Sequence, residues 1–148
     1  MNVTRRRVIA LIGVFVSTIA AIGRVRANDR PFKAFQSDDF NLTMAELFGG
    51  AVVDSDAIKI GATDLAENGA VVPVKVEASL PGVKRITLLV PNNPVPLVGQ
   101  FEMINTDAFI ATRIKMGGSD DIVAVVETAG GAFQARKHVE VAIGGCGD

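Results

Sequence analysis

The sequence contains no tryptophan and no tyrosine, and it has only one cysteine and one histidine among its 148 residues. Without Trp or Tyr, platforms on which sugars or nucleobases could stack are disfavoured. Zinc and copper sites need clustered Cys and His side chains, so the lone Cys146 and the lone His138 predict no metal site. We therefore expect neither a metal ion nor another resident cofactor. Phenylalanine and abundant aliphatic residues are left to form the core.

The polar residues show no pattern typical of a catalytic site. The carboxylate pair at residues 38–39 falls where a helix cap is expected, and the pair at 120–121 follows two glycines in a predicted turn. His138 lies on the polar face of a predicted strand, where it is expected to face solvent. It precedes Cys146 by eight residues, more than about 20 Å of extended chain, which is too far for a base that activates the thiol. We predict no catalytic residue and no enzyme activity.

The N-terminal segment, residues 1–27, is typical of an export signal. A basic region containing Arg5 and Arg6 precedes an apolar stretch at 8–22, which is shorter than the roughly 20 residues of a membrane-spanning helix. Small residues up to Ala27 predict cleavage there. The adjacent arginines favour a twin-arginine signal over an ordinary Sec signal, the alternative. We expect a periplasmic protein whose mature chain begins at Asn28.

Removal of this signal changes the charge of the protein. Five arginines and no acidic residue leave with it, so ten basic residues face sixteen acidic ones and the mature chain carries a net charge near −6. Nucleic-acid binding requires a basic surface, so a nucleic-acid partner is not expected. About 121 residues remain, enough for a single domain with one core.

One short helix is predicted near the start of the mature chain. Four apolar residues recur there at helical spacing, and Gly49 with Gly50 is expected to end the helix. Its cap is predicted to be either Thr43, which with Glu46 would form a capping box, or one of Ser37 and Asp38. The apolar residues are Phe40, Met44, Leu47 and Phe48.

The rest of the chain to residue 143 has the two-residue alternation and the turn signals of β-strands. Pro73 is expected at a strand start or an edge, because proline donates no ladder hydrogen bond. The proline-rich segment 91–96 is interpreted as a crossing between two sheets, and 129–132 as a hairpin turn. With no helix between strands, residues 28–143 are predicted to form a mainly β protein, a two-sheet antiparallel sandwich. Its seven or so strands are 58–60, 72–78, 86–90, 100–104, 109–116, 121–128 and 133–143.

The single cysteine lies near the end of the chain, within residues 144–148. Gly144 and Gly145 precede Cys146, and Gly147 follows it. Glycines leave the thiol uncrowded and the backbone free to move, so we predict a flexible arm that reaches at most about 17 Å. A lone cysteine in an exported protein is a reactive thiol, an intermolecular disulfide or an inert residue. A carrier thiol, a structural or adhesive domain that dimerises through this cysteine, and an incidental tail all stay open at this point.

Four segments of the chain resemble the SoxY family, the sulfur-carrying subunits of the Sox thiosulfate-oxidation system. They are the terminal Gly-Gly-Cys-Gly at 144–147 and the segments 67–74, 93–98 and 112–116. The resemblance implies an immunoglobulin-like sandwich and a non-catalytic carrier that binds thiosulfate-derived sulfur covalently, at Cys146. The family motif usually ends in a second glycine, and here Asp148 takes that place.

The resemblance also implies a set of protein partners. A SoxZ-like subunit would form a heterodimer with the chain, and a haem-containing c-type cytochrome would join thiosulfate to the cysteine. A sulfate-releasing hydrolase and a sulfane dehydrogenase would then act on the bound sulfur.

Overall fold

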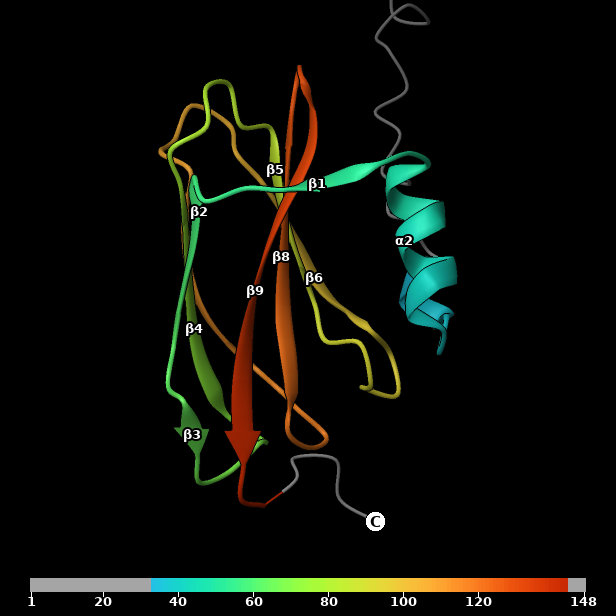
Figure 1. Ribbon diagram of the computed structural model, residues 1–148, viewed down its shortest axis with the longest axis vertical. Coiled ribbons are helices and arrows are strands. Elements are labelled where there is room, and N and C mark those ends of the chain that lie inside the picture. Colours follow the sequence, from blue (N-terminus) through green and yellow to red (C-terminus); the bar gives the residue numbers. More distant parts are fainter. Residues whose placement is uncertain (1–32, 144–148) are drawn as a thin grey trace, which may run out of the picture. The chain divides into compact units, whose positions relative to one another are not determined.

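The computed structural model describes residues 33–143; the predicted signal with Arg5 and Arg6, and the predicted arm at 144–148, lie outside the described residues. The described chain is mainly β, as predicted (Figure 1). Within that range, no helix is both long and apolar enough to cross a membrane. The elements are η1 (Ala34–Gln36), α2 (Phe40–Phe48), β1 (Val52–Asp54), β2 (Ile58–Ala62), β3 (Leu65–Ala66), β4 (Val72–Ala78), β5 (Arg85–Leu89), β6 (Leu97–Glu102), β7 (Phe109–Ile114), β8 (Asp120–Thr128) and β9 (Gly131–Val141).

Two sheets form the sandwich. Sheet A has the strand order β1-β9-β8-β5-β6, with β3 also paired to β9, and sheet B has the order β2-β4-β7. All seven predicted strands are present and pair antiparallel, and β8 and β9 form the predicted hairpin around residues 129–130. The two strands that the sequence did not predict, β1 and β3, run parallel to β9. Sheet A is therefore a mixed sheet.

The main core lies between the two sheets and follows the alternation of the strands. In β4, for example, Val72, Val74 and Val76 are fully buried while the residues between them are exposed. Pro73 lies at the strand start, where β2 has already ended, since β2 pairs only with Val74 to Ala78. The missing N–H of the proline therefore leaves no gap in the ladder, as expected from the sequence.

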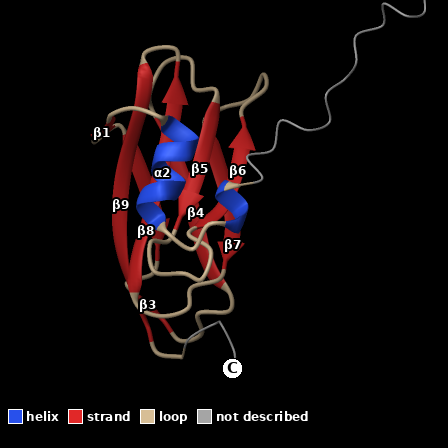
Figure 2. Ribbon diagram, turned by 90° about the vertical axis from the view of Figure 1, so that its right-hand side faces the viewer, coloured by secondary structure: helices blue, strands red, loops and turns tan. Residues whose placement is uncertain are grey.

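A second, smaller core covers the other face of sheet A. The central strands β5 and β8 are buried on both faces, with Leu89, Val123 and Val125 facing away from sheet B. Helix α2 and η1 cover these residues through the predicted apolar stripe, so the domain has three layers (Figures 1 and 2). Arg136 of β9 adds a contact over the ring of Phe40, 5.8 Å from its centroid, within the range of a cation–π interaction.

The helix is capped by one of the two aspartates that the sequence places at a helix cap. Asp39 is the N-cap, and its carboxylate accepts a hydrogen bond from the Leu42 N–H at 2.8 Å. The other predicted caps, Thr43, Ser37 and Asp38, were wrong. Thr43 lies inside the helix, buried, and its hydroxyl donates to the Asp39 carbonyl at 2.8 Å. Gly49 ends the helix in the left-handed conformation (φ 58°), as predicted.

Two loop interpretations are corrected by the topology. Segment 91–96 does not cross between sheets, because it joins β5 to β6, which are antiparallel neighbours in sheet A. The sheets are crossed elsewhere, for example by 79–84 between β4 and β5, by 103–108 between β6 and β7, and by 115–119 between β7 and β8. Asp120 and Asp121 begin β8 instead of lying in a turn.

The helix layer makes the residues beneath it part of the folded core. We predict that Leu89→Ala lowers the free energy of unfolding by about 2–5 kcal/mol, because Leu89 is fully buried under the helix and its truncation leaves a cavity. Leu42→Ala is the control, since this helix residue is 66% exposed and its truncation is expected to cost under about 1 kcal/mol. Urea unfolding of both variants measures the difference. Equal losses would show that the helix does not cover sheet A in solution.

Candidate functional site: the base of the C-terminal arm

Residues 141–143, the last that the structure describes, lead into the C-terminal segment 144–148. Strand β9 ends at Val141, but its backbone hydrogen bonds go further: the Ala142 N–H donates to the Ala66 carbonyl at 3.0 Å, and the Gly69 N–H donates to the Ile143 carbonyl at 2.7 Å. The side chain of Ile143 is 68% exposed. The chain is therefore fixed up to the residue before the glycines, at the end of the domain near β3 (Figure 1).

Gly69 is the central link of this region. Besides its bond to Ile143, its carbonyl accepts a hydrogen bond from the Met116 N–H at 2.8 Å. The Asn68 side chain shapes the same turn by accepting from the Ala70 N–H at 2.8 Å. One buried glycine thus connects the end of β9 to the β7–β8 crossing.

A second loop joins the same cluster through two asparagines. The Asn93 amide donates to the Lys115 carbonyl and accepts from the Gly117 N–H, both at 2.8 Å. The backbone N–H of Asn92 donates to the carboxylate of Asp120 at 2.7 Å. The proline-rich loop therefore fastens the β7–β8 crossing from the other side.

The end of β9 is also held by side chains. The Val141 N–H donates to the Ser119 hydroxyl at 2.8 Å. Lys137, the one polar residue on the inward face of β9, forms an ion pair with Asp64 next to β3. The hydrogen bond from Lys137 and its positive charge hold the pKa of the Asp64 carboxyl below its usual value. We call the segments 67–71, 91–96, 115–119 and 141–143 together the arm base.

The arm base unites the segments that resemble the SoxY family. In the sequence the segments at 67–74, 93–98 and 112–116 are separated, and they meet at one end of the domain, next to the residues that lead into 144–147. Of the predicted site residues, Cys146 and the arm glycines lie outside the described residues. Sequence reasoning missed Gly69, Asn93 and Ser119 as supports of the arm, although the Asn-Gly and Asn-Asn pairs are turn signals that could have identified two of them.

The histidine is exposed, as predicted, and it has two acidic neighbours. His138 Nδ1 lies 2.9 Å from an Asp121 oxygen and Nε2 lies 3.5 Å from a Glu140 oxygen. The hydrogen bond to Asp121 raises the pKa of His138 above its ordinary value, with a smaller contribution from Glu140. In the described part of the chain, no group of three His, Cys, Asp or Glu side chains is arranged to hold a metal ion.

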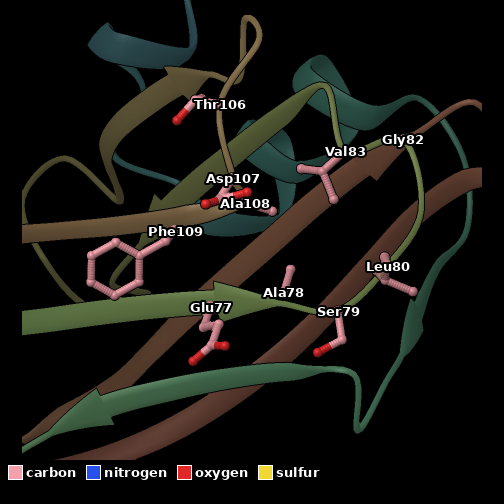
Figure 3. Close-up of a pocket in the computed structure, with 10 residues that line it drawn as sticks. All are labelled: Glu77, Ala78, Ser79, Leu80, Gly82, Val83, Thr106, Asp107, Ala108 and Phe109. Atoms are coloured by element: carbon pink, nitrogen blue, oxygen red, sulfur yellow. The ribbon is translucent and has the colours of Figure 1, made fainter.

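A surface depression lies at the other end of the sandwich. It has a volume of about 670 Å³ and lies where β4 ends and β7 begins, with Glu77, Asp107 and Phe109 among its lining residues (Figure 3). It is open to solvent, and none of its lining residues is a Cys, His, Lys or Arg. Its polar lining side chains are the carboxylates of Glu77 and Asp107 and the hydroxyls of Ser79 and Thr106.

Comparison with known proteins identifies the group to which this arrangement belongs. The family model of the sulfur oxidation protein SoxY matches residues 44–146, a range that ends at Cys146. The chain belongs to the SoxY family. The structure of the sulfur carrier protein SoxY from Chlorobium limicola f thiosulfatophilum is 34% identical, covers 74% of this chain and 96% of its own, and superposes with a TM-score of 0.65.

More distant structures share only the fold of this SoxY-family chain. A superoxide reductase (neelaredoxin) from Ignicoccus hospitalis is 21% identical, covers 64% of this chain and 98% of its own, and has a TM-score of 0.54. The comparison with curated protein sequences gives no match. The family match supports a sulfur-carrier role, which the resemblance in the sequence had implied.

The asparagine clamp of the arm base gives a first test. We predict that Asn93→Ala lowers the free energy of unfolding by about 1–3 kcal/mol, because a Lys115 carbonyl and a Gly117 N–H lose their partner. Hydrogen exchange should become faster at the amides of Gly117 and Met116. Thr106→Ala, an exposed loop change at the opposite end of the domain, is the control. Unchanged exchange at both amides in Asn93→Ala would contradict the clamp.

The histidine gives a second test, which depends on pH. Since the folded-state pKa of His138 is raised, its pairing with Asp121 stabilises the fold below pH about 6.5 and is lost as pH rises through the folded-state pKa. Asp121→Asn should therefore lower that pKa and destabilise the protein in acid but not in alkali. Because the chain has a single histidine, its imidazole protons titrate unambiguously by NMR. A smaller decrease in the pKa of His138 is expected in Glu140→Gln. A larger decrease there than in Asp121→Asn would show that Glu140 is the main partner of the histidine.

Proposed function

We propose that this SoxY-family chain is an exported, periplasmic sulfur carrier that binds thiosulfate-derived sulfur covalently on Cys146. The observation that carries the proposal is the arm base: an exposed end of β9, fixed up to Ile143 by the hydrogen bond from Gly69, which leads directly into residues 144–148. Cys146 is the third of them and the chain's only thiol. A thiol so placed suits a carrier, since it can enter a cleft of another protein while the sandwich stays outside.

The proposed chemistry uses the sulfur atom of Cys146 alone. Its thiolate joins the terminal sulfur of thiosulfate with the loss of two electrons, which a haem-containing c-type cytochrome accepts, and Cys–S–S–SO₃⁻ forms. A hydrolase then adds water, releases sulfate and two protons, and leaves a persulfide, Cys–S–S⁻. A sulfane dehydrogenase oxidises the remaining sulfur. The chain itself catalyses none of these steps, so each active site belongs to a partner.

Export and a companion subunit complete the proposal. Arg5 and Arg6 would direct the chain through the twin-arginine route, with cleavage after Ala27, and a SoxZ-like subunit would form a heterodimer with the mature domain. Twin-arginine export carries folded proteins, which suits a domain that meets a partner before it crosses the membrane. Gly144, Gly145 and Gly147 supply the freedom of the arm.

Mass spectrometry of the protein from the periplasm of thiosulfate-grown cells tests the proposal. We predict an intact mass that begins at Asn28, with a fraction increased by one sulfur atom or by one S–SO₃ group, and a reductant should remove both additions. Cys146→Ser is the control and should carry neither. It also removes any intermolecular disulfide, so non-reducing gels run in parallel separate the alternatives. A stable disulfide dimer without a sulfur adduct would overturn the carrier role in favour of a structural domain.

A further inference from the structure

The outer face of sheet B gathers basic side chains on a protein that is acidic overall. Residues paired directly across neighbouring strands share a face, and this register brings Lys75 between Gly61 and Ala111, with Lys59 and Arg113 at the diagonal positions. All three cations are exposed. We call Lys59, Lys75 and Arg113 with the residues between them the basic face; it lies on the side of the domain away from α2 (Figure 1).

The cations of the basic face form no ion pair among the described residues, although Lys59 lies directly across from Glu77 in the register of β2 and β4. Among residues 33–143, the ion pairs of lysine and arginine use Arg85 and Lys137, and none involves Lys59, Lys75 or Arg113. Glu77 is the only acidic residue on the three paired strands of sheet B. The mature chain has a net charge near −6, so this concentration of positive charge stands apart from the rest of the protein.

Protection of sheet edges explains only part of this pattern. Lysine and arginine on edge strands discourage pairing with other chains, and Lys59 on β2 and Arg113 on β7 are edge residues. Lys75, however, is on the central strand β4. The surface around Lys75 is recessed, because its neighbours Gly61 and Ala111 have little or no side chain. A shallow depression of about 220 Å³ lies between Lys75 and Arg113. A partner can therefore approach the charges closely.

The basic face adjoins the arm base at one end. Arg113 precedes Ile114, which pairs with Val72, and the next contact along the same two segments is the hydrogen bond from Met116 to Gly69. Gly69 is the residue that holds Ile143. A protein seated on Lys75 and Arg113 therefore lies next to the root of the segment that carries Cys146.

We propose that the basic face docks an acidic surface of the protein that receives the arm and modifies its cysteine. Opposite charges steer diffusional encounter and add orientation, while an interface with few apolar side chains favours transient binding over a permanent assembly. This suits a carrier, which must leave one enzyme to visit the next. The inference rests on the proposed carrier function and adds to it the surface through which an enzyme recognises the domain.

The test measures how fast Cys146 gains its sulfur adduct. The purified full chain is added with thiosulfate to a periplasmic extract that lacks its own copy, and mass spectrometry follows the adduct over time. We predict that Lys75→Glu with Arg113→Glu lowers the rate about tenfold or more at low ionic strength, and that added salt reduces the gap between this variant and the wild type. The neutral pair Lys75→Gln and Arg113→Gln should show an intermediate rate.

Lys84→Glu provides the matched control. It makes the same change at an exposed residue of the β4–β5 loop, off the basic face, and should leave the rate within about twofold of the wild type. Unfolding temperature confirms that every variant folds, and an alkylating reagent confirms that each Cys146 is equally accessible. If the wild type gains no adduct, the carrier function itself fails. If the wild type gains the adduct and the face variants gain it as fast as Lys84→Glu, the docking proposal fails while the carrier function stands.

Carbodiimide coupling locates the contact independently, because it joins lysine amines directly to carboxylates of a bound partner. In the extract we expect partner peptides on Lys59 and Lys75. Coupling confined to Lys33, Lys84 and Lys137 would overturn the proposal. Coupling to a second copy of this chain would also overturn the proposal. The same holds if the wild type binds phosphatidylglycerol vesicles, the face variants lose this binding, and the adduct rate of these variants is unchanged.

Discussion

The burial of sheet A on both faces is the constraint on which the rest of the domain depends. Strands β5 and β8 expose none of their central residues to solvent, so each face of the sheet must be covered by another layer. Sheet B covers one face, and α2 with η1 covers the other. The helix is therefore a structural layer and not an appendage. Because the helix layer covers sheet A, none of the described elements covers the outer face of sheet B. That face is exposed to solvent and carries charged side chains.

Strand β9 joins this layered domain to the arm. It pairs with β8 along most of its length, and the short strands β1 and β3 run beside its other edge. Its inner residues belong to the main core, and its outer residues contact the helix layer at Arg136. The last residues before the glycines are consequently tied to the core by both packing and hydrogen bonds. The proposed carrier segment needs such a fixed origin, because motion of the origin would add to any motion of the segment.

Much of this architecture could be predicted from the sequence, because long strands and amphipathic helices leave strong periodic signals. The alternation in 72–78 predicted both ends of β4 correctly, and the apolar stripe from Phe40 to Phe48 predicted the helix and its buried side. Strands β1 and β3 were missed because three and two residues are too short to show a period, and their parallel pairing with β9 depends on contacts distant in sequence. The cap of the helix was left open among Ser37, Asp38, Asp39 and Thr43, because each of these side chains can accept a hydrogen bond from a free helical N–H. Only the folded backbone shows that Asp39 takes this role.

The interpretation of the proline-rich segment failed in a more informative way. Three prolines and two asparagines correctly indicated irregular backbone, but no local signal shows which residues an irregular loop is bonded to. The Asn93 amide is satisfied by Lys115 and Gly117, residues more than twenty positions away, and only the folded chain brings them together. The same holds for Gly69. The support of the arm is thus a tertiary property, whereas the cysteine itself was evident from the sequence because its place among glycines is local.

The dimensions of the domain limit where a modifying enzyme can sit. Cys146 is the third residue after Ile143, so its backbone lies at most about 10 Å from that point when extended, while the seven residues of β4 alone are about 23 Å long at 3.3 Å per residue. The depression near Phe109 itself therefore lies beyond the reach of Cys146. An enzyme bound over Lys75 and Arg113 would have the thiol confined to a small volume beside its surface, which raises the effective concentration of the thiol without any further contact. On this argument, weak and salt-sensitive docking near the arm base is sufficient for efficient transfer, and tight binding would only slow the release of the carrier to the next enzyme.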